Sequence, residues 1–530
     1  MKHATKWDKQ YTELSRNITL GLVAGLLFVG GQYSSTALAH PDQEHTGIYS
    51  TTGDVADGSF TIETGLAVTA ESAGGASVNQ NKSTVSVTNN TLTVKGMLSS
   101  SGYGGYSFQE AISVVNALKN NLILTGTIAV TADDERLYGA FGGYANASLG
   151  TIPVGSSGKL EANASNNVIS GTGTESTFWF NTDFNTITIP EVDAYSAGTI
   201  SPEAGLELNS ALMGGYAVAS ATSTAGIADS RNAQSIQEAA TANNNTVNFS
   251  TLNIQPVVDV KGQDGSQGQA IEYRSMVTVG GGQSLAVNTA KGSYVDHNDT
   301  NVASADGNTF TVGTLNLEET VNSVRAELEQ TTTLSGGDSL AQYQSPSSIQ
   351  KRKSDSKISR ITESYQNTTY NITNTATANN NTETLGAIVI GGKLETSDAG
   401  GQATDIEAEG ELETRAGHAR AVVYLNDTNS QLDGLVNTAQ SNGNTLTVNS
   451  VTQNIPPKST QDSSGAVTQA ATVTMLLHGG HARSNITQNG TNNVVWKNIK
   501  SSASTDNNTI TLENISSNAT ESSLTGGAST

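Results

Sequence analysis

The chain contains no cysteine among its 530 residues. Disulfide frameworks, thiolate metal sites and thiol nucleophiles are therefore excluded. Basic residues are also scarce, because 26 Lys and Arg stand against 48 Asp and Glu, which gives a formal net charge of -22. Binding to a phosphate backbone needs clustered basic side chains, so this balance argues against a nucleic-acid partner.

Large apolar and aromatic residues are few, at 35% hydrophobic and 5% aromatic residues. These are too few to fill several compact cores, although Val, Ile and Leu alternate too regularly for a disordered chain. Beyond the N-terminus, no segment approaches the roughly 18 apolar residues of a membrane-spanning helix. A stacked repeat, which needs only a thin core in each unit, fits this composition.

The N-terminus has the three parts of a secretory signal peptide. A basic segment, residues 2–16, precedes an apolar run over residues 18–31, and Ala37-Leu38-Ala39 follows as a cleavage site. We predict a signal peptide over residues 1–39 and an exported mature chain. The alternative is an uncleaved anchor.

One phrase, an Asn followed by alternating Thr and apolar residues, returns throughout the chain. Its Asn lies at Asn90, Asn185, Asn245, Asn308, Asn381, Asn444 and Asn508. Period-two alternation predicts a strand with Thr outside and Val, Ile or Leu inside. The Asn or Gly just before the phrase tolerates the left-handed backbone of a corner.

A second phrase is a Gly pair preceded by alternating apolar residues, and it permits another sharp turn. It lies around Gly142, Gly214, Gly280, Gly336, Gly391 and Gly479, and it begins again at Gly526. The two phrases together predict an all-β fold, a right-handed parallel β-helix with irregular polar loops. Stacking at about 4.8 Å would align the Asn side chains in hydrogen-bonded ladders. We expect each unit of about 63 residues to supply two or three coils.

Two segments depart from the repeat. Residues 107–121 have a capping box in Ser107 and Glu110 and apolar residues at helical spacing, which favours a short helix at the N-terminal end over another coil. Residues 345–360 form a basic cluster that we interpret as an exposed loop, with a protease-sensitive site or a contact with an acidic partner as alternatives. We divide the mature chain into an N-terminal segment over 40–126 and a repeat region over 127–530.

Ser339 lies in Gly337-Asp338-Ser339-Leu340, the motif that carries the nucleophile of one esterase family. A serine nucleophile needs a histidine base, and the only Asp-x-x-His pair, Asp42 with His45, lies on the wrong side. The stretch also aligns with the preceding unit, where Gln283 takes the place of Asp338. The repeat thus explains the motif, with Gly336 and Gly337 as corner residues and Asp338 as a variable surface position.

No other group of residues predicts a site. His478 and His481 are the only close histidine pair, but metal sites usually have three or four ligands and the Gly pair between them belongs to the repeat. The acidic runs at Ala132 and Asp405 lack the pattern of a calcium loop and indicate solvated faces. Glu411, Glu413 and Arg415 resemble a random cluster. We therefore predict no catalytic, cofactor-binding or metal-binding residue.

The signal ending at Ala39, the Asn-Thr phrases and the "GGYA" phrases at Gly142 and Gly214 together resemble the passenger regions of autotransporters and adhesin-like type V secreted proteins of Gram-negative bacteria. The resemblance implies a β-helix at the cell surface or outer membrane, often adhesive, exported through a C-terminal outer-membrane barrel. The barrel pattern does not follow the last repeat. We favour a truncated reading frame over a passenger encoded apart from its translocator.

Three functions remain open. The first is a structural or adhesive surface protein without catalysis, which binds a host, matrix or neighbouring-cell ligand. The second is an enzyme that acts on glycans or esters, because lyases and tailspikes also use β-helices. The third is a spacer without a ligand of its own.

Overall fold

The computed structural model describes twenty-three segments of the chain, and their regular structure is entirely β-strand. The described residues are 46–49, 54–62, 67–68, 72–80, 82–95, 97–98, 101–110, 113–124, 127–131, 138–152, 157–171, 176–183, 206–224, 235–259, 271–291, 297–322, 325–344, 368–395, 405–425, 430–454, 468–488, 495–517 and 521–526. In this part of the chain no helix is long and apolar enough to cross a membrane. The predicted signal peptide, the Asp42 and His45 pair, Asn185 and the basic cluster at 345–360 lie outside these residues.

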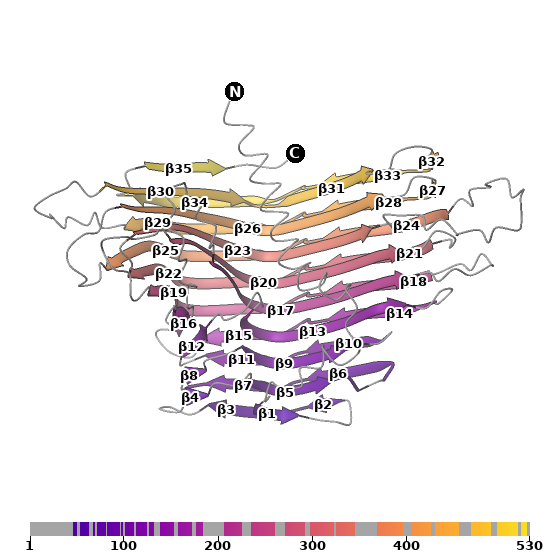
Figure 1. Ribbon diagram of the computed structural model, residues 1–530, viewed down its shortest axis with the longest axis horizontal. Coiled ribbons are helices and arrows are strands. Elements are labelled where there is room, and N and C mark those ends of the chain that lie inside the picture. The colour runs from indigo at the N-terminus through magenta and orange to yellow at the C-terminus, as the bar shows by residue number, and fades with distance from the viewer. Residues whose placement is uncertain are drawn as a thin grey trace, which may run out of the picture.

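The strands form three parallel sheets, here called A, B and C, stacked in chain order from indigo to yellow in Figure 1. Sheet A contains β1 (Thr46–Tyr49), β5 (Ser72–Val78), β9 (Gly102–Gln109), β13 (Tyr138–Ile152), β17 (Leu206–Thr224), β20 (Ile271–Lys291), β23 (Arg325–Gln344), β26 (Asp405–Leu425), β30 (Thr468–His478), β31 (His481–Gln488) and β35 (Glu521–Gly526). Sheet B contains β2 (Val55–Ala56), β6 (Thr84–Thr88), β10 (Val114–Leu118), β14 (Ser157–Asn163), β18 (Ser235–Thr241), β21 (His297–Ser304), β24 (Thr368–Thr377), β27 (Ser430–Asp433), β28 (Val436–Gln440), β32 (Val495–Lys497) and β33 (Lys500–Ser504). Sheet C contains β3 (Ser59–Ile62), β4 (Ala67–Val68), β7 (Thr91–Val94), β8 (Met97–Leu98), β11 (Asn121–Leu124), β12 (Thr127–Thr131), β15 (Val168–Gly171), β16 (Ser176–Asp183), β19 (Thr246–Asp259), β22 (Thr309–Asn322), β25 (Thr382–Glu395), β29 (Thr445–Asn454) and β34 (Thr509–Ser517).

Each coil passes through sheets A, B and C in turn and then returns to sheet A one layer further on. For example, β20, β21 and β22 occupy the three sheets, and β23 pairs with β20 in parallel. The predicted parallel β-helix is therefore confirmed. The expected two or three coils per unit are wrong, because one unit makes one coil. The strands of a unit are long and reach 21 residues in β20 and β26. One passage through the three sheets therefore includes all residues of the unit.

The short helix expected over residues 107–121 is also wrong. The segment forms the end of β9 and all of β10. Val115 and Ala117 are fully buried while their neighbours in β10 are half-buried, which is the period-two pattern of a strand. Ser107, the expected helix cap, is buried in β9 instead. Pairing with β6 and β14 on either side overrides the weak helical spacing.

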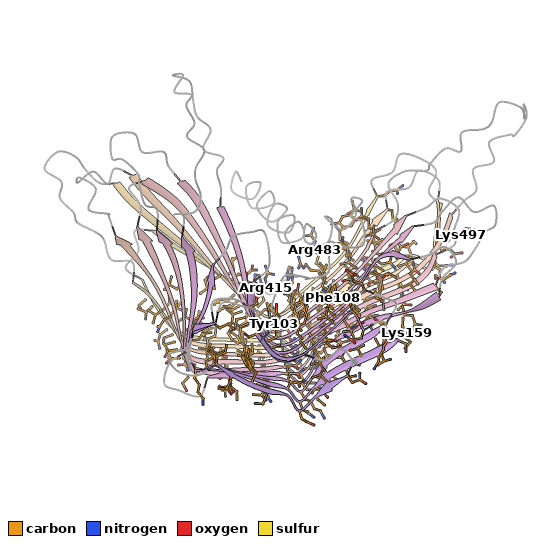
Figure 2. The ribbon with its side chains drawn as sticks, turned by 60° about the horizontal axis from the view of Figure 1, so that its bottom comes forward. Tyr103, Phe108, Lys159, Arg415, Arg483 and Lys497 are labelled. Atoms are coloured by element: carbon orange, nitrogen blue, oxygen red, sulfur yellow. The ribbon has the colours of Figure 1, made fainter. Side chains whose placement is uncertain are left out.

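Seen nearly along their stacking axis, the coils form two arms that meet at an angle (Figure 2). In one arm the first half of sheet A covers sheet C over a core of Leu, Val, Ile and Phe side chains, such as Leu122, Phe310 and Leu385. In the other arm the second half of sheet A covers sheet B over a core made mostly of alanine, such as Ala219 and Ala303. Small side chains let the two sheets of this arm approach closely.

An asparagine ladder runs through the point where the arms meet. Each amide Nδ2 donates to the Oδ1 of the next Asn, at 3.0 to 3.2 Å. The ladder consists of Asn90, Asn120, Asn167, Asn245, Asn308, Asn381, Asn444 and Asn508. The predicted ladder is therefore confirmed, and the structure adds Asn120 and Asn167. Every Oδ1 from Asn120 onward also accepts a hydrogen bond from the backbone N–H of the preceding Asn.

The glycine pairs of sheet A make room for this ladder. A Cβ built on Gly337 would lie 2.7 Å from the Asn381 Nδ2 atom and 2.3 Å from the Ala305 carbonyl oxygen. Only a residue without a side chain fits there. One phrase was assigned wrongly from the sequence, because Gly391 lies in β25 of sheet C. Ala416 and Gly417 hold the corner position in that coil, since Gly417 pairs with Gly337.

The residue before each ladder Asn has a left-handed backbone, as predicted for the corner. Asn or Gly holds most of these positions, for example Asn244 at φ 56° and Gly307 at φ 67°. Lys119 is the exception, with φ 56° and an exposed side chain. Left-handed backbone costs about 1–2 kcal/mol for most residues, whereas Asn adopts it readily.

Replacing Lys119 with Asn is therefore expected to raise the free energy of unfolding by about 1 kcal/mol. Urea unfolding monitored by circular dichroism measures the change. Lys119→Ala is the matched control, because it removes the same charge without relieving the backbone. Equal stabilisation by both substitutions would contradict the backbone explanation.

Candidate functional site

Sheet A presents a row of side chains on each side of its bend, on the inner side of the angle. In a straight strand, residues three apart point to opposite faces. The rings of Tyr103 and Tyr106 in β9 nevertheless lie 4.8 Å apart, centroid to centroid. The strand therefore bends at Gly104 and Gly105, and both flanking side chains lie on the same side of the bend. Figure 2 shows Tyr103 on the inner side of the angle.

The register of sheet A aligns these flanking residues in two rows, here called the inner rows. The row before the glycine pairs is Ala73, Tyr103, Phe141, Met213, Gly280, Ser335, Arg415 and His478. The row after them is Ala76, Tyr106, Tyr144, Tyr216, Gln283, Asp338, His418 and His481. The chemistry along both rows changes from aromatic to charged toward the C-terminal coils.

The N-terminal half of the inner rows is packed with rings. Tyr103 stacks on Phe141 at 5.4 Å, and Tyr144 stacks on both Tyr106 and Tyr216, at 5.1 and 5.3 Å. Phe141 and Tyr216 are almost fully buried. Burial raises the pKa of the Tyr216 hydroxyl well above its usual value. These rings close the bend by packing against one another, so this half is a structural core.

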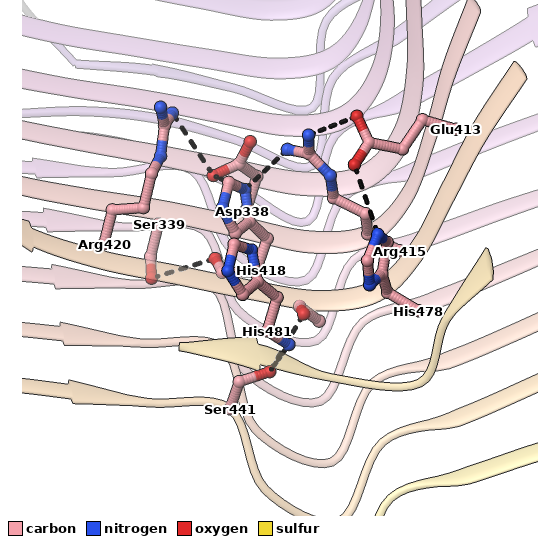
Figure 3. Close-up of polar contacts among 10 residues, drawn as sticks. Asp338, Ser339, Glu413, Arg415, His418, Arg420, Ser441, His478 and His481 are labelled. Atoms are coloured by element: carbon pink, nitrogen blue, oxygen red, sulfur yellow. Dashed lines mark hydrogen bonds and ion pairs between the residues drawn. The ribbon is translucent and has the colours of Figure 1, made fainter. Parts of the chain in front are cut away.

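The C-terminal half holds a cluster of charged and imidazole side chains, shown in Figure 3. Arg415 pairs with Glu413 on the same strand, and its Nη1 donates to the His418 Nδ1 atom at 2.8 Å. Asp338 Oδ1 lies 3.5 Å from the same imidazole nitrogen and 4.0 Å from Arg420 Nη2. These groups are brought together by β23 and β26, which are neighbours in sheet A.

Two further histidines complete this cluster. His478 Nε2 lies 3.6 Å from Glu413 Oε1. The His481 ring stacks on His418, with centroids 4.8 Å apart and planes 3° from parallel. The backbone N–H of His481 donates to Ser441 Oγ at 3.2 Å, which ties β31 to the corner of the preceding coil.

Burial and charge set the protonation of this cluster. Burial raises the pKa of the Asp338 carboxyl, but His418, Arg420 and Arg415 outweigh it and hold that pKa below its usual range. Burial, with the positive charge of Arg415, lowers the pKa of His418 well below its usual value. The same two effects lower the pKa of His481 to about 3. Both imidazoles are thus neutral at pH 7, whereas Asp338 is ionised.

Ser339, the residue of the esterase-like motif, lies on the opposite face of sheet A from this cluster. Its side chain is fully buried beside the alanine core, and its Oγ lies 3.4 Å from the His418 carbonyl oxygen. Successive residues of a strand point to opposite faces, so Asp338 faces the inside of the bend while Ser339 faces the core. The pairing of Asp338 with Gln283 across neighbouring coils is confirmed. Asp338 is not a surface position, because only 13% of its side chain is exposed.

The structure brings together some of the residues that the sequence set aside. Glu413 and Arg415, interpreted as a random cluster, form a buried ion pair. His478 and His481 both face the inside of the bend, with ring centroids 5.8 Å apart. Among the described residues no group of three or more His, Asp or Glu is arranged to hold a metal ion. The side chains of Glu411, of the acidic run at Ala132 and of most of the run at Asp405 lie outside the described side chains. Glu413, the last residue of the run at Asp405, is buried, so the predicted solvated face is wrong at that residue.

Sequence reasoning missed Asp338 and Arg420 as members of this cluster, and it missed Arg483, which pairs in register with Arg420. The signal was present in the glycine phrases, which read "SGGDSL", "RAGHAR" and "HGGHAR" in the last coils. Aligning them places Arg420 and Arg483 at one position. This alignment is hard to recognise because Ala416 replaces the first Gly of the pair. The pair at Gly391 therefore fits the sequence phrase better, although it lies in sheet C.

We compared the chain with protein-family models, curated proteins and solved structures, and no significant match was found.

Proposed function

We propose that the chain is an exported, cell-surface β-helical protein with a structural and adhesive role and without catalysis. The observation that carries this proposal is the continuous asparagine ladder from Asn90 to Asn508, which ties successive coils into one stiff rod. A rod of stacked coils suits display of a binding face at a distance from its point of attachment. The burial of Ser339 beside the alanine core supports a non-catalytic role.

Export belongs to the same proposal, with a signal peptide over residues 1–39 and an outer-membrane translocator barrel as partner. Full-length protein produced in a Gram-negative host is expected to begin at His40 after secretion, as determined by N-terminal sequencing. Ala39→Asp should retain the full-length N-terminus, because the cleavage site needs a small residue. Wild-type protein that keeps Met1 and stays in the cytoplasm would contradict export.

Binding is tested on arrays of glycans and matrix proteins with the secreted protein, alongside ester and polysaccharide-lyase substrates. We expect retention on at least one surface ligand and no turnover. Hydrolysis that disappears in Ser339→Ala would overturn the proposal in favour of an enzyme. Neither binding nor turnover would favour a spacer.

A further inference from the structure

A third row of sheet A lies beside the inner rows, three residues after the second glycine of each pair. It consists of Val78, Phe108, Asn146, Val218, Leu285, Leu340, Arg420 and Arg483. Most coils place an apolar residue here, so the fold does not need a charged one. Arginine at this position in two consecutive coils departs from the repeat, and such departures are expected at functional sites.

The two arginines lie on neighbouring strands and carry like charges. Arg420 in β26 pairs in register with Arg483 in β31, and paired strands are about 4.8 Å apart. Their repulsion is only partly compensated. Asp338 lies 4.0 Å from Arg420 Nη2, and the Nε of Arg420 is buried without a hydrogen-bond partner among the described residues. Arg483 is exposed and has no acidic side chain within 4 Å in the described part of the chain.

The surroundings also favour an anion. Among the described side chains, this cluster holds three arginines, Arg415, Arg420 and Arg483, and two carboxylates, Asp338 and Glu413, which gives a charge of 3 − 2 = +1 when the histidines are neutral. The complete chain has a net charge of -22. Long-range repulsion thus opposes a polyanion, whereas a ligand with a single negative group is attracted to this one place.

We propose that Arg420 and Arg483 bind the carboxylate of an acidic sugar at the end of an otherwise neutral glycan. A guanidinium group presents its N–H donors in a planar fork that matches the two oxygens of a carboxylate. The anion would remove the repulsion between the two guanidinium groups. The partly exposed His481 ring beside them offers a flat surface for the C–H face of a sugar.

This inference rests on the proposed adhesive function, for which it supplies the ligand class. Isothermal titration of the full secreted protein compares sialyllactose with lactose, two probes that differ only in one acidic sugar. We expect sialyllactose to bind and lactose not to bind. Arg483→Gln should weaken sialyllactose binding about tenfold or more, because charged hydrogen bonds are lost. Arg483→Lys should restore it only in part, because an ammonium group lacks the planar fork.

Lys500→Gln is the matched control, because it removes one exposed positive charge from sheet B in the same part of the solenoid. It should leave binding unchanged, and thermal unfolding should show that all three variants fold. Equal binding of lactose, or wild-type binding by Arg483→Gln, would overturn the inference. So would inorganic sulfate that binds as tightly as sialyllactose, since this would mean an oxyanion site without sugar recognition. Loss of export contradicts only the proposed function. Failure to bind sialyllactose contradicts only this inference.

Discussion

Replacing Asn381 with Ala is expected to lower the free energy of unfolding by about 4 kcal/mol, since each buried donor left without a partner costs about 1–3 kcal/mol. Asn381 Oδ1 accepts from the backbone N–H of Asn308 at 2.8 Å and from its Nδ2 at 3.1 Å. Both donors are buried and lose their acceptor. Asn381 Nδ2 also donates to Asn444 Oδ1 at 3.1 Å, so the ladder breaks on both sides.

Urea unfolding of wild type and variant measures this loss, and hydrogen exchange of the Asn308 and Asn444 amides shows whether it begins at the break. Asn449→Ala is the control, because Asn449 is exposed in β29 and outside the ladder. Its effect should stay within about 0.5 kcal/mol. Similar losses from both substitutions would mean that the ladder contributes no more than a surface amide.

Replacing Glu383 with Leu is expected to stabilise the protein at neutral pH. Glu383 is fully buried in β25, paired in register with Phe310 on one side and Leu446 on the other, in the Leu-, Val- and Phe-rich arm. Burial raises the pKa of its carboxyl from 4.5 to about 8, and the nearby backbone N–H of Gly336 opposes this only in part. Neither carboxyl oxygen has a hydrogen-bond partner among the described residues.

The sign of the pH dependence follows from that shift. Below pH 4.5 the carboxyl is protonated in both the folded and the unfolded chain, so Glu383 causes no loss of stability. Between pH 4.5 and 8 only the unfolded chain ionises, and stability falls as the pH rises. At about 1.4 kcal/mol for each pKa unit, the loss is about 3 kcal/mol at pH 7 and about 5 kcal/mol above pH 8.

Urea unfolding at pH 5, 7 and 9 tests this expectation. Glu383→Leu should remove the loss and gain about 3 kcal/mol at pH 7. Glu383→Gln separates the charge from the polarity, because it should remove the same pH dependence while keeping a buried polar group. A wild-type stability that does not fall between pH 5 and 9, relative to Glu383→Leu, would show that Glu383 does not carry the penalty.

The pH dependence of Glu383 is separate from the charged cluster at the bend. Asp338 has a lowered pKa, so its contribution to stability is present at neutral pH and is lost only in strong acid. Glu238 is also buried with a raised pKa, so it too gains stability on acidification, whereas the lowered pKa values of His418 and His481 act in the opposite direction. Only the difference between wild type and Glu383→Leu is therefore assigned to Glu383.

Some features of the fold could be predicted because they are local. The alternation after Asn308 or Asn444 specifies a strand with its apolar side chains inward, whatever surrounds it. Corner residues such as Asn244 and Gly307 are recognisable because few residue types adopt a left-handed backbone. The ladder followed from these two features together, because identical corners in stacked coils bring identical side chains together.

Other features depend on distant parts of the chain and could not be predicted. The alanine arm was missed because columns such as Ala240, Ala303 and Ala376 have no recognisable core pattern until sheets A and B face each other. The two early ladder members Asn120 and Asn167 were missed because their spacing follows the loops, with steps of 30, 47 and 78 residues around them.

The sequence by itself determined the strand phrases, the corners and the parallel stacking, because each depends on the preference of a few adjacent residues. Only the tertiary structure decided that one unit makes one coil, that Ala416 and Gly417 rather than Gly391 form a corner, and that Asp338, Arg415 and His418 meet. Those outcomes depend on the register between strands about 60 to 80 residues apart, as in the pairing of Asp338 with His418. Loop lengths and packing fix that register, and no local pattern of residues encodes it.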